Sequence, residues 1–127
     1  MTAPHLHSVR VYYEDTDFSG AVYHASYLRF MERARTEMLR ARGVSQGQEA
    51  FGFVVRSLTI DYLKAARMDD LLSIETRVEK IGGATLELDQ RAARGGEVLA
   101  RAQIRVACVA DGRAARIPQW VLDKLRA

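Results

Sequence analysis

Three carboxylates, a glycine, a histidine and four tyrosines lie within residues 12–27, YYEDTDFSGAVYHASY. Asp17 offers a carboxylate that can act as a nucleophile, or as a base through a water molecule. His24 stands where a helix is expected to begin, and no Ser or Asp immediately precedes it to cap the first backbone amides. Free amides at a helix start can stabilise a developing oxyanion, so this segment is suited to attack on a carbonyl carbon.

The same segment also has a purely structural interpretation. Carboxylates just before a helix commonly accept hydrogen bonds from loop amides, and Asp15, Thr16 and Asp17 all suit that role. We assign Asp15 to holding the loop, with Gly20 as the turn residue. The His24 side chain either orients Asp17 or the substrate, or only packs and forms hydrogen bonds.

Other catalytic and binding motifs are missing from the sequence. His5, His7 and His24 are not spaced as ligands on one helix face, and there is no cysteine pair, which argues against a metal site. The sequence has neither the GxSxG of serine hydrolases nor the GxxxxGK of phosphate-binding loops. Cys108 is the only cysteine, and its apolar surroundings, IRVACV, predict a small buried thiol in a reducing compartment.

The composition is that of one globular domain, which we expect to span residues 1–127. The chain is 48% hydrophobic and 28% charged, and its net charge of +3 comes mainly from arginines scattered over separate segments. Because these arginines form no basic stripe, a nucleic-acid-binding role is not favoured. The N-terminal residues lack the apolar stretch of a secretion signal, and no segment reaches membrane-spanning length, so we expect a cytoplasmic protein.

Periodicity predicts the elements that must position the candidate residues. A first strand is predicted over residues 9–14, and a helix from about His24 until Gly43 ends it. Apolar residues at helical spacing, among them Phe30, Met31 and Met38, should form the core. The period then becomes two, and a short helix follows Pro118. The later strands are predicted over residues 53–63, 71–81, 85–93 and 98–110.

Tight turns at Gly82-Gly83 and Gly95-Gly96 join the later strands into hairpins. Consecutive hairpins imply an antiparallel sheet, and the amphipathic helix must bury its apolar face against that sheet. The predicted fold class is therefore α+β, with a five-stranded antiparallel sheet wrapped around one long central helix and a short C-terminal helix. The edges of such a sheet could pair with a second copy of the chain.

The segment VRVYYEDTDFSGAVYHASYLRFMERARTEMLR closely resembles the start of the bacterial acyl-CoA thioesterases associated with the Tol-Pal system. These proteins are a branch of the hydroxybenzoyl-CoA thioesterase family, which has the hotdog fold. The resemblance continues through FVVRSLTIDYLKAARMDDLLSIETRV and into IRVACV, so it covers nearly the whole chain. The residues that carry its most specific motif are Asp17, Gly20, Val22, Tyr23, His24 and Tyr27.

The resemblance implies an enzyme that hydrolyses the thioester of acyl-CoA to a free carboxylic acid and CoA. Asp17 would be the catalytic carboxylate, as nucleophile or general base, and the backbone N–H at His24 would polarise the carbonyl. Gly20, Tyr23 and Tyr13 would contribute to substrate binding, although a core position suits Tyr13 at least as well. No metal or other cofactor is implied, because coenzyme A is part of the substrate.

Members of the family form dimers whose sheets join edge to edge, often paired into tetramers, with the active sites at the dimer interface. The resemblance therefore implies a homodimer or homotetramer, basic residues that meet the CoA phosphates, and a link to envelope or phospholipid-synthesis proteins. One alternative is a non-catalytic acyl-CoA or acyl-carrier binding module of the same fold. Another is a hotdog dehydratase, but the chain lacks the proline-rich motif of those enzymes.

Overall fold

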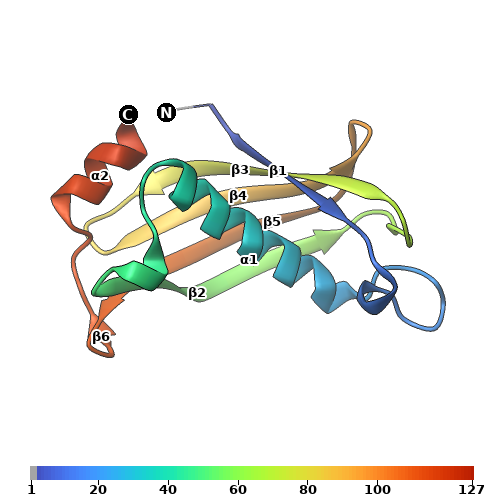
Figure 1. The fold of residues 1–127 in the computed structure, drawn as a ribbon, viewed down its shortest axis with the longest axis horizontal. Helices are drawn as coiled ribbons and strands as arrows, with labels where there is room; N and C mark the ends of the chain where they lie inside the picture. Colours follow the sequence, from blue (N-terminus) through green and yellow to red (C-terminus); the bar gives the residue numbers. More distant parts are fainter. Residues whose placement is uncertain (1–2) are drawn as a thin grey trace.

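The computed structural model describes residues 3–127, in which one antiparallel sheet curls around helix α1 (Figure 1). The strands lie in the order β1-β3-β4-β5-β2, and a two-residue strand, β6, pairs with β5. The predicted fold class is confirmed, as are the four strands predicted after the long helix, whereas the first strand is displaced. The elements are β1 (His5–Arg10), η1 (Tyr13–Asp15), α1 (His24–Ala41), η2 (Gln46–Gln48), β2 (Phe51–Tyr62), β3 (Leu71–Ile81), β4 (Thr85–Arg94), β5 (Glu97–Ala110), β6 (Arg113–Ala114) and α2 (Gln119–Arg126).

The first strand lies earlier than predicted, because β1 ends at Arg10 opposite the first residue of β3, Leu71. The chain then leaves the sheet and forms the 3-10 turn η1. The Tyr12 amide donates a hydrogen bond to the Asp15 carboxylate at 2.8 Å, which stabilises the start of this turn. The prediction of a strand over residues 9–14 was therefore wrong beyond Arg10. Tyr13 is 78% exposed on this turn, so the core position considered for it is also wrong.

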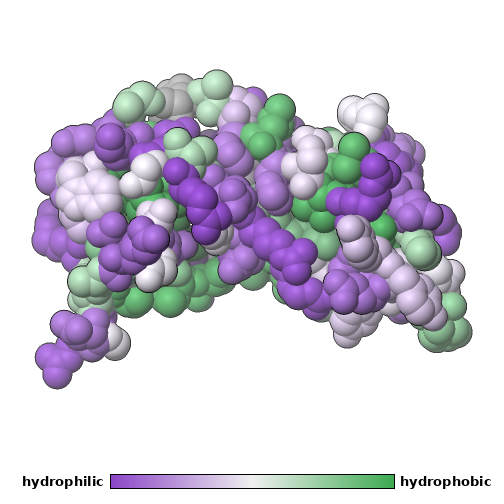
Figure 2. All heavy atoms as spheres, viewed as in Figure 1, coloured by the Kyte–Doolittle hydropathy of each residue, from purple (hydrophilic) through white to green (hydrophobic). Residues whose placement is uncertain are grey.

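Helix α1 begins and ends where the helical spacing predicted. Phe30, Met31 and Met38 are buried against the sheet, which confirms their assignment to the core. At the C-terminus the Val44 amide donates to the Leu39 carbonyl, and Gly43 has the left-handed φ of +85° that this capping motif requires. The outward face of α1 is hydrophilic (Figure 2). No helix within residues 3–127 is both long and apolar enough to cross a membrane.

Strand β2 forms an exposed edge of the sheet, because β5 is its only strand partner in the described part of the chain. Apolar side chains along it remain partly exposed, including Val54 at 49%, Val55 at 43% and Leu58 at 39%. Hydrophobic residues gather along the lower edge of the molecule in Figure 2, where Figure 1 places β2. A long apolar edge of this kind favours pairing with another strand.

Candidate functional site

Asp17 lies in the loop that joins η1 to α1, and the loop closes on itself around this residue. The Asp17 amide donates to the Ala21 carbonyl at 2.9 Å, and the Gly20 amide donates to the Asp17 carbonyl at 3.0 Å. Gly20 has a φ of +86°, in the left-handed region that glycine adopts without a steric penalty. This conformation confirms its predicted role as the turn residue and fixes the direction in which the Asp17 side chain leaves the loop.

The Asp17 carboxylate is fully exposed and uses one of its two oxygens within the loop. Its Oδ1 atom accepts hydrogen bonds from the Ser19 amide, at 2.8 Å, and from the Ser19 hydroxyl. These bonds lower the pKa of Asp17 below its ordinary value, and the nearby His24 lowers it further by a smaller amount. No donor from residues 3–127 bonds to Oδ2. The residue is therefore ionised at neutral pH, with one oxygen available to a substrate or water.

The first backbone amides of α1 are free, as the missing cap predicted. The residue before the helix, Tyr23, has an extended backbone and makes no side-chain capping bond, and the first turn contains no acidic residue. The amides of His24 and Ala25 donate no hydrogen bond within the described chain, whereas the Ser26 amide donates to the Tyr23 carbonyl. The positive end of the helix dipole is therefore open to a ligand oxygen.

Aromatic rings surround the start of α1. The His24 ring lies 4.4 Å from the Tyr23 ring and 6.1 Å from the Tyr62 ring, measured between centroids. The Tyr62 hydroxyl also donates to the His24 carbonyl at 3.0 Å, which ties the end of β2 to the first turn of the helix. A cavity of about 280 Å³ opens beside these rings. It is lined by Val22, His24, Tyr27, Tyr62, Leu63, Lys64 and Ala65.

The structure brings together some of the predicted site residues and separates others. His24 lines the cavity, Tyr23 packs on the His24 ring, and Gly20 turns the loop that leads to them. Asp17 lies on this loop but does not line the cavity, and the exposed Tyr13 lies on η1. Within residues 3–127 there is no group of three or more His, Cys, Asp or Glu side chains arranged to hold a metal ion.

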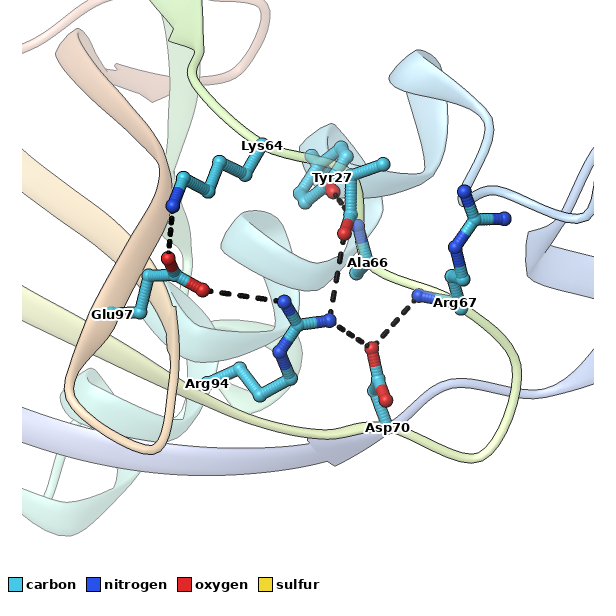
Figure 3. Close-up of polar contacts among 8 residues, drawn as sticks. Tyr27, Lys64, Ala66, Arg67, Asp70, Arg94 and Glu97 are labelled. Carbon is cyan, nitrogen blue, oxygen red and sulfur yellow. Dashed lines mark hydrogen bonds and ion pairs between the residues drawn. The ribbon is translucent and has the colours of Figure 1, made fainter.

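The loop after β2 forms one wall of the cavity, and an ion-pair network holds it in place (Figure 3). Arg94, at the end of β4, donates to the Asp70 carboxylate at 2.7 Å and to the Ala65 carbonyl at 3.5 Å. Arg94 and Lys64 also pair with Glu97 at the start of β5. The residues of this network were not among the predicted site residues, because ion pairs between distant segments leave no local pattern in a sequence.

The same loop is tied to the segment that carries Asp17. The Ala66 amide donates to the Tyr27 hydroxyl at 3.1 Å, and the Ala66 carbonyl accepts from the Val22 amide at 2.8 Å. A β-bridge joins Ala21 to Arg67. The position of the Asp17 loop therefore depends on a loop about fifty residues later in the sequence.

The Arg67 side chain lies beside the Asp17 loop. A β-carbon at position 20 would be 3.7 Å from Arg67 Nη1, so the guanidinium lies close to Gly20. In Figure 3 the side chain extends away from Asp70, which accepts a hydrogen bond from the Arg67 backbone amide. The guanidinium itself forms no hydrogen bond or ion pair with residues 3–127, although its charge helps to lower the pKa of Asp70. It is therefore a cation available to a ligand beside the Asp17 loop.

Comparison with known proteins assigns a family to this fold and site. Residues 11–125 match the family model described as the thioesterase-like superfamily. The acyl-CoA thioesterase YbgC of Haemophilus influenzae is 50% identical over 109 residues, which cover 83% of this chain and 80% of that protein. The acyl-CoA thioester hydrolase YbgC of Escherichia coli O6:H1 is 49% identical over 105 residues, covering 80% and 78%.

A solved structure supports the same assignment. The probable thioesterase from Bartonella henselae superposes with a TM-score of 0.89 at 39% identity, covering 91% of this chain and 100% of that chain. The expected hotdog fold and the predicted thioesterase class are confirmed by these matches. The chain belongs to the thioesterase-like superfamily.

Proposed function

We propose that this protein hydrolyses acyl-CoA thioesters to a free carboxylic acid and CoA, without a cofactor. The observation that carries the proposal is the ionised Asp17 carboxylate, with a free Oδ2, on the loop that leads into the uncapped start of α1. A thioester carbonyl needs two groups for this reaction: one to attack it or activate water, and one to bind the developing oxyanion. Asp17 and the amides of His24 and Ala25 supply both.

In the proposed reaction, the thioester oxygen accepts a hydrogen bond from a free amide at the start of α1. If Asp17 acts as a base, it takes a proton from water while the water oxygen bonds to the carbonyl carbon. The carbon–sulfur bond then breaks, and the proton passes to the departing CoA thiolate. If Asp17 acts as a nucleophile, its oxygen bonds to the carbonyl carbon while the carbon–sulfur bond breaks and the CoA thiolate leaves, which gives a mixed anhydride. Water then hydrolyses the anhydride to the free acid and the Asp17 carboxylate, and a proton from that water passes to the thiolate. The His24 ring, packed on Tyr23, helps to hold the helix start in place.

The CoA part of the substrate would bind at Arg67. Its guanidinium lies next to Gly20 on the Asp17 loop and forms no ion pair within the described chain, whereas Lys64 is already paired with Glu97. A guanidinium binds phosphate oxygens through several hydrogen bonds at once, so Arg67 suits the pyrophosphate of CoA. We place the reaction in the cytoplasm, where the unpaired Cys108 would remain reduced.

The proposed enzyme is at least a homodimer. Pairing of β2 with the β2 strand of a second copy would satisfy its free backbone groups and cover Val54, Leu58 and Tyr62, which are partly exposed. Tyr62 connects this edge to His24, so the edge pairing would lie next to the proposed oxyanion site. Two such dimers could associate into the tetramer expected from the family resemblance.

Thiol release from a panel of short-chain, long-chain and benzoyl-CoA thioesters tests the proposal. We expect wild-type protein to hydrolyse at least one class, and Asp17→Asn to bind the same thioester without hydrolysing it. Asp17→Asn preserves the size of the side chain and can still accept the Ser19 hydrogen bonds, so it changes mainly the charge. Binding of CoA thioesters by wild-type protein without thiol release would instead support the non-catalytic binding module.

A further inference from the structure

A second feature of the molecule lies about three helical turns along α1 from His24, or roughly 16 Å. Arg35 is partly buried there between the helix and the sheet, and this burial lowers the pKa of its guanidinium. It forms no ion pair with residues 3–127. Its one hydrogen bond within the chain is donated by Nη1 to Gln90 Oε1 at 3.0 Å. A partly buried guanidinium that bonds only to one neutral amide oxygen retains N–H groups that a ligand can satisfy.

The polar groups behind Arg35 hold its guanidinium in one orientation. Gln90 on β4 is fully buried, and its Nε2 atom donates to the Met31 carbonyl and to the Thr76 hydroxyl oxygen, both at 2.9 Å. These two bonds fix the side-chain amide so that Oε1 faces Arg35. The hydrogen bond to Oε1 therefore restrains the guanidinium, and its remaining N–H groups are available to a ligand.

Arg35 borders a small cavity of about 70 Å³ between α1, η2 and the sheet. Thr36 and Gln46 add polar groups to its wall, whereas the deeper part is apolar. Glu32 also borders the cavity, and its negative charge partly offsets the effect of burial on Arg35. None of the residues that line this cavity lines the one beside His24. The apolar part is formed mainly by Met38, Leu39, Phe53, Leu86, Leu88 and Val106.

We propose that this cavity binds the anion of a small carboxylic acid, with its carboxylate on the Arg35 guanidinium and its hydrocarbon part against Met38 and Leu86. A guanidinium matches the planar geometry of a carboxylate, and the apolar wall favours a hydrocarbon tail. Glu32 repels a dianion more strongly than a monoanion, and inorganic phosphate has no hydrocarbon part for the apolar wall, so phosphate should bind poorly. The site does not depend on hydrolysis at Asp17, although the acid released by the proposed reaction belongs to the same class of ligand.

The test follows the methyl group of Met38 by NMR in protein labelled with [methyl-¹³C]methionine. Sodium butyrate is titrated at constant ionic strength, and the neutral butyramide and inorganic phosphate are titrated in parallel. We expect butyrate to shift the Met38 peak in a saturable way, with the exposed Met68 as an internal control, and the other two compounds to leave it unchanged. An equal response to butyramide or to phosphate would overturn the proposal.

Matched variants separate binding at Arg35 from a general effect of charge. Arg35→Gln should abolish the butyrate response, whereas Arg33→Gln, the same change on the exposed side of α1, should retain it. Arg35→Lys keeps the charge but loses the planar geometry, so it should bind butyrate at least several-fold more weakly than wild type. A full butyrate response in Arg35→Gln would overturn the proposal. If Arg35→Gln does not fold, a butyrate response in Arg35→Lys equal to that of wild type would overturn the proposal.

Discussion

At the scale of single residues, the exposed Asp17 owes its lowered pKa to its immediate neighbours. The largest contribution to its lowered pKa is the hydrogen bond from the Ser19 hydroxyl, followed by the bond from the Ser19 amide. A low pKa keeps the carboxylate ionised across the neutral range, but it also makes the group a weaker base. The loop therefore extends the ionised form of the carboxylate to more acidic pH.

Ser19→Ala should raise the pKa of Asp17 toward its ordinary value, because it removes the hydroxyl bond and retains the amide bond. Asp17 would then become protonated at a higher pH, and the acidic limb of the plot of kcat/KM against pH would shift to higher pH by the same amount. Titration of the Asp17 carboxyl carbon by NMR measures the shift directly. Ser8→Ala, at an exposed position on β1, should leave the pKa of Asp17 unchanged. An equal shift in both variants would contradict this account.

Gly20→Ala should destabilise the protein by roughly 1 kcal/mol, because alanine is strained at the left-handed φ of +86°. The effect would come from the backbone, since a β-carbon there would make only an ordinary contact with Arg67. Gly47→Ala is the matched control: position 47 has open space and lacks the left-handed φ. Urea unfolding of both variants compares the two effects. A Gly20→Ala protein as stable as Gly47→Ala would show that the turn is not strained.

At the scale of secondary-structure elements, most of the fold could be predicted from the sequence. The sequence alternates clearly from β2 onward, so those strands lie within two residues of their predicted bounds. The first strand was misplaced because two of its three inward-facing positions, His5 and His7, are not apolar. The alternation at Tyr12 and Tyr13 belongs instead to a turn held by Asp15.

The missed part of the candidate site has a different cause. Tyr62 joins the site through its hydrogen bond to the His24 carbonyl. In the cavity wall, Lys64 pairs with Glu97 and the Ala65 carbonyl accepts from Arg94, both about thirty residues further along the sequence. Contacts of this kind depend on which strands become neighbours in the sheet. Local periodicity predicts where strands lie but not which distant side chains meet.

Asp70→Asn tests the ion-pair network that holds the loop after β2. Hydrogen bonds from the Arg67 amide and from Arg94 lower the pKa of Asp70 in the folded protein. The stability it contributes is therefore present above its unfolded-state pKa and is lost as pH falls through the lower folded-state pKa. At pH 7 we expect Asp70→Asn to lose no more than about 1 kcal/mol, because these groups are partly exposed.

Urea unfolding at several pH values measures this effect, with Asp61→Asn as the control. Asp61 is more exposed, and its only ion pair in the described chain is the long one to Arg101, at 3.9 Å. The difference between wild type and Asp70→Asn should shrink at acidic pH, whereas Asp61→Asn should have little effect at any pH. A loss of stability in Asp70→Asn that is the same at pH 7 and below the folded-state pKa would argue against an electrostatic role.

At the scale of the whole molecule, a single copy of the chain leaves one apolar edge of its sheet unpaired. Helix α1 covers the concave face and α2 lies at one end, but neither covers the outer edge of β2 (Figure 1). The proposed oxyanion site adjoins this edge through Tyr62. Assembly and catalysis are therefore linked in the proposed function, because a second copy on β2 would also border the cavity beside His24.

Introducing Val54→Lys and Leu58→Lys together should prevent this pairing, because charged side chains on an edge strand oppose association. Light scattering should give at least a dimer for wild type and a monomer for the double variant at the same concentration. Leu6→Lys changes an exposed residue on the opposite edge of the sheet, β1, and should retain the wild-type mass. A monomeric wild type, or a double variant of unchanged mass, would contradict assembly through β2.

The most direct test of the central claim is kcat/KM for the best acyl-CoA substrate, measured with wild type and Asp17→Asn. We predict a loss of at least about 100-fold, the usual scale for an essential acid–base group. The loss should lie in kcat, with thioester binding and the urea midpoint close to those of wild type. A folded Asp17→Asn protein that retains more than about a tenth of wild-type kcat/KM would show that Asp17 is not the catalytic carboxylate.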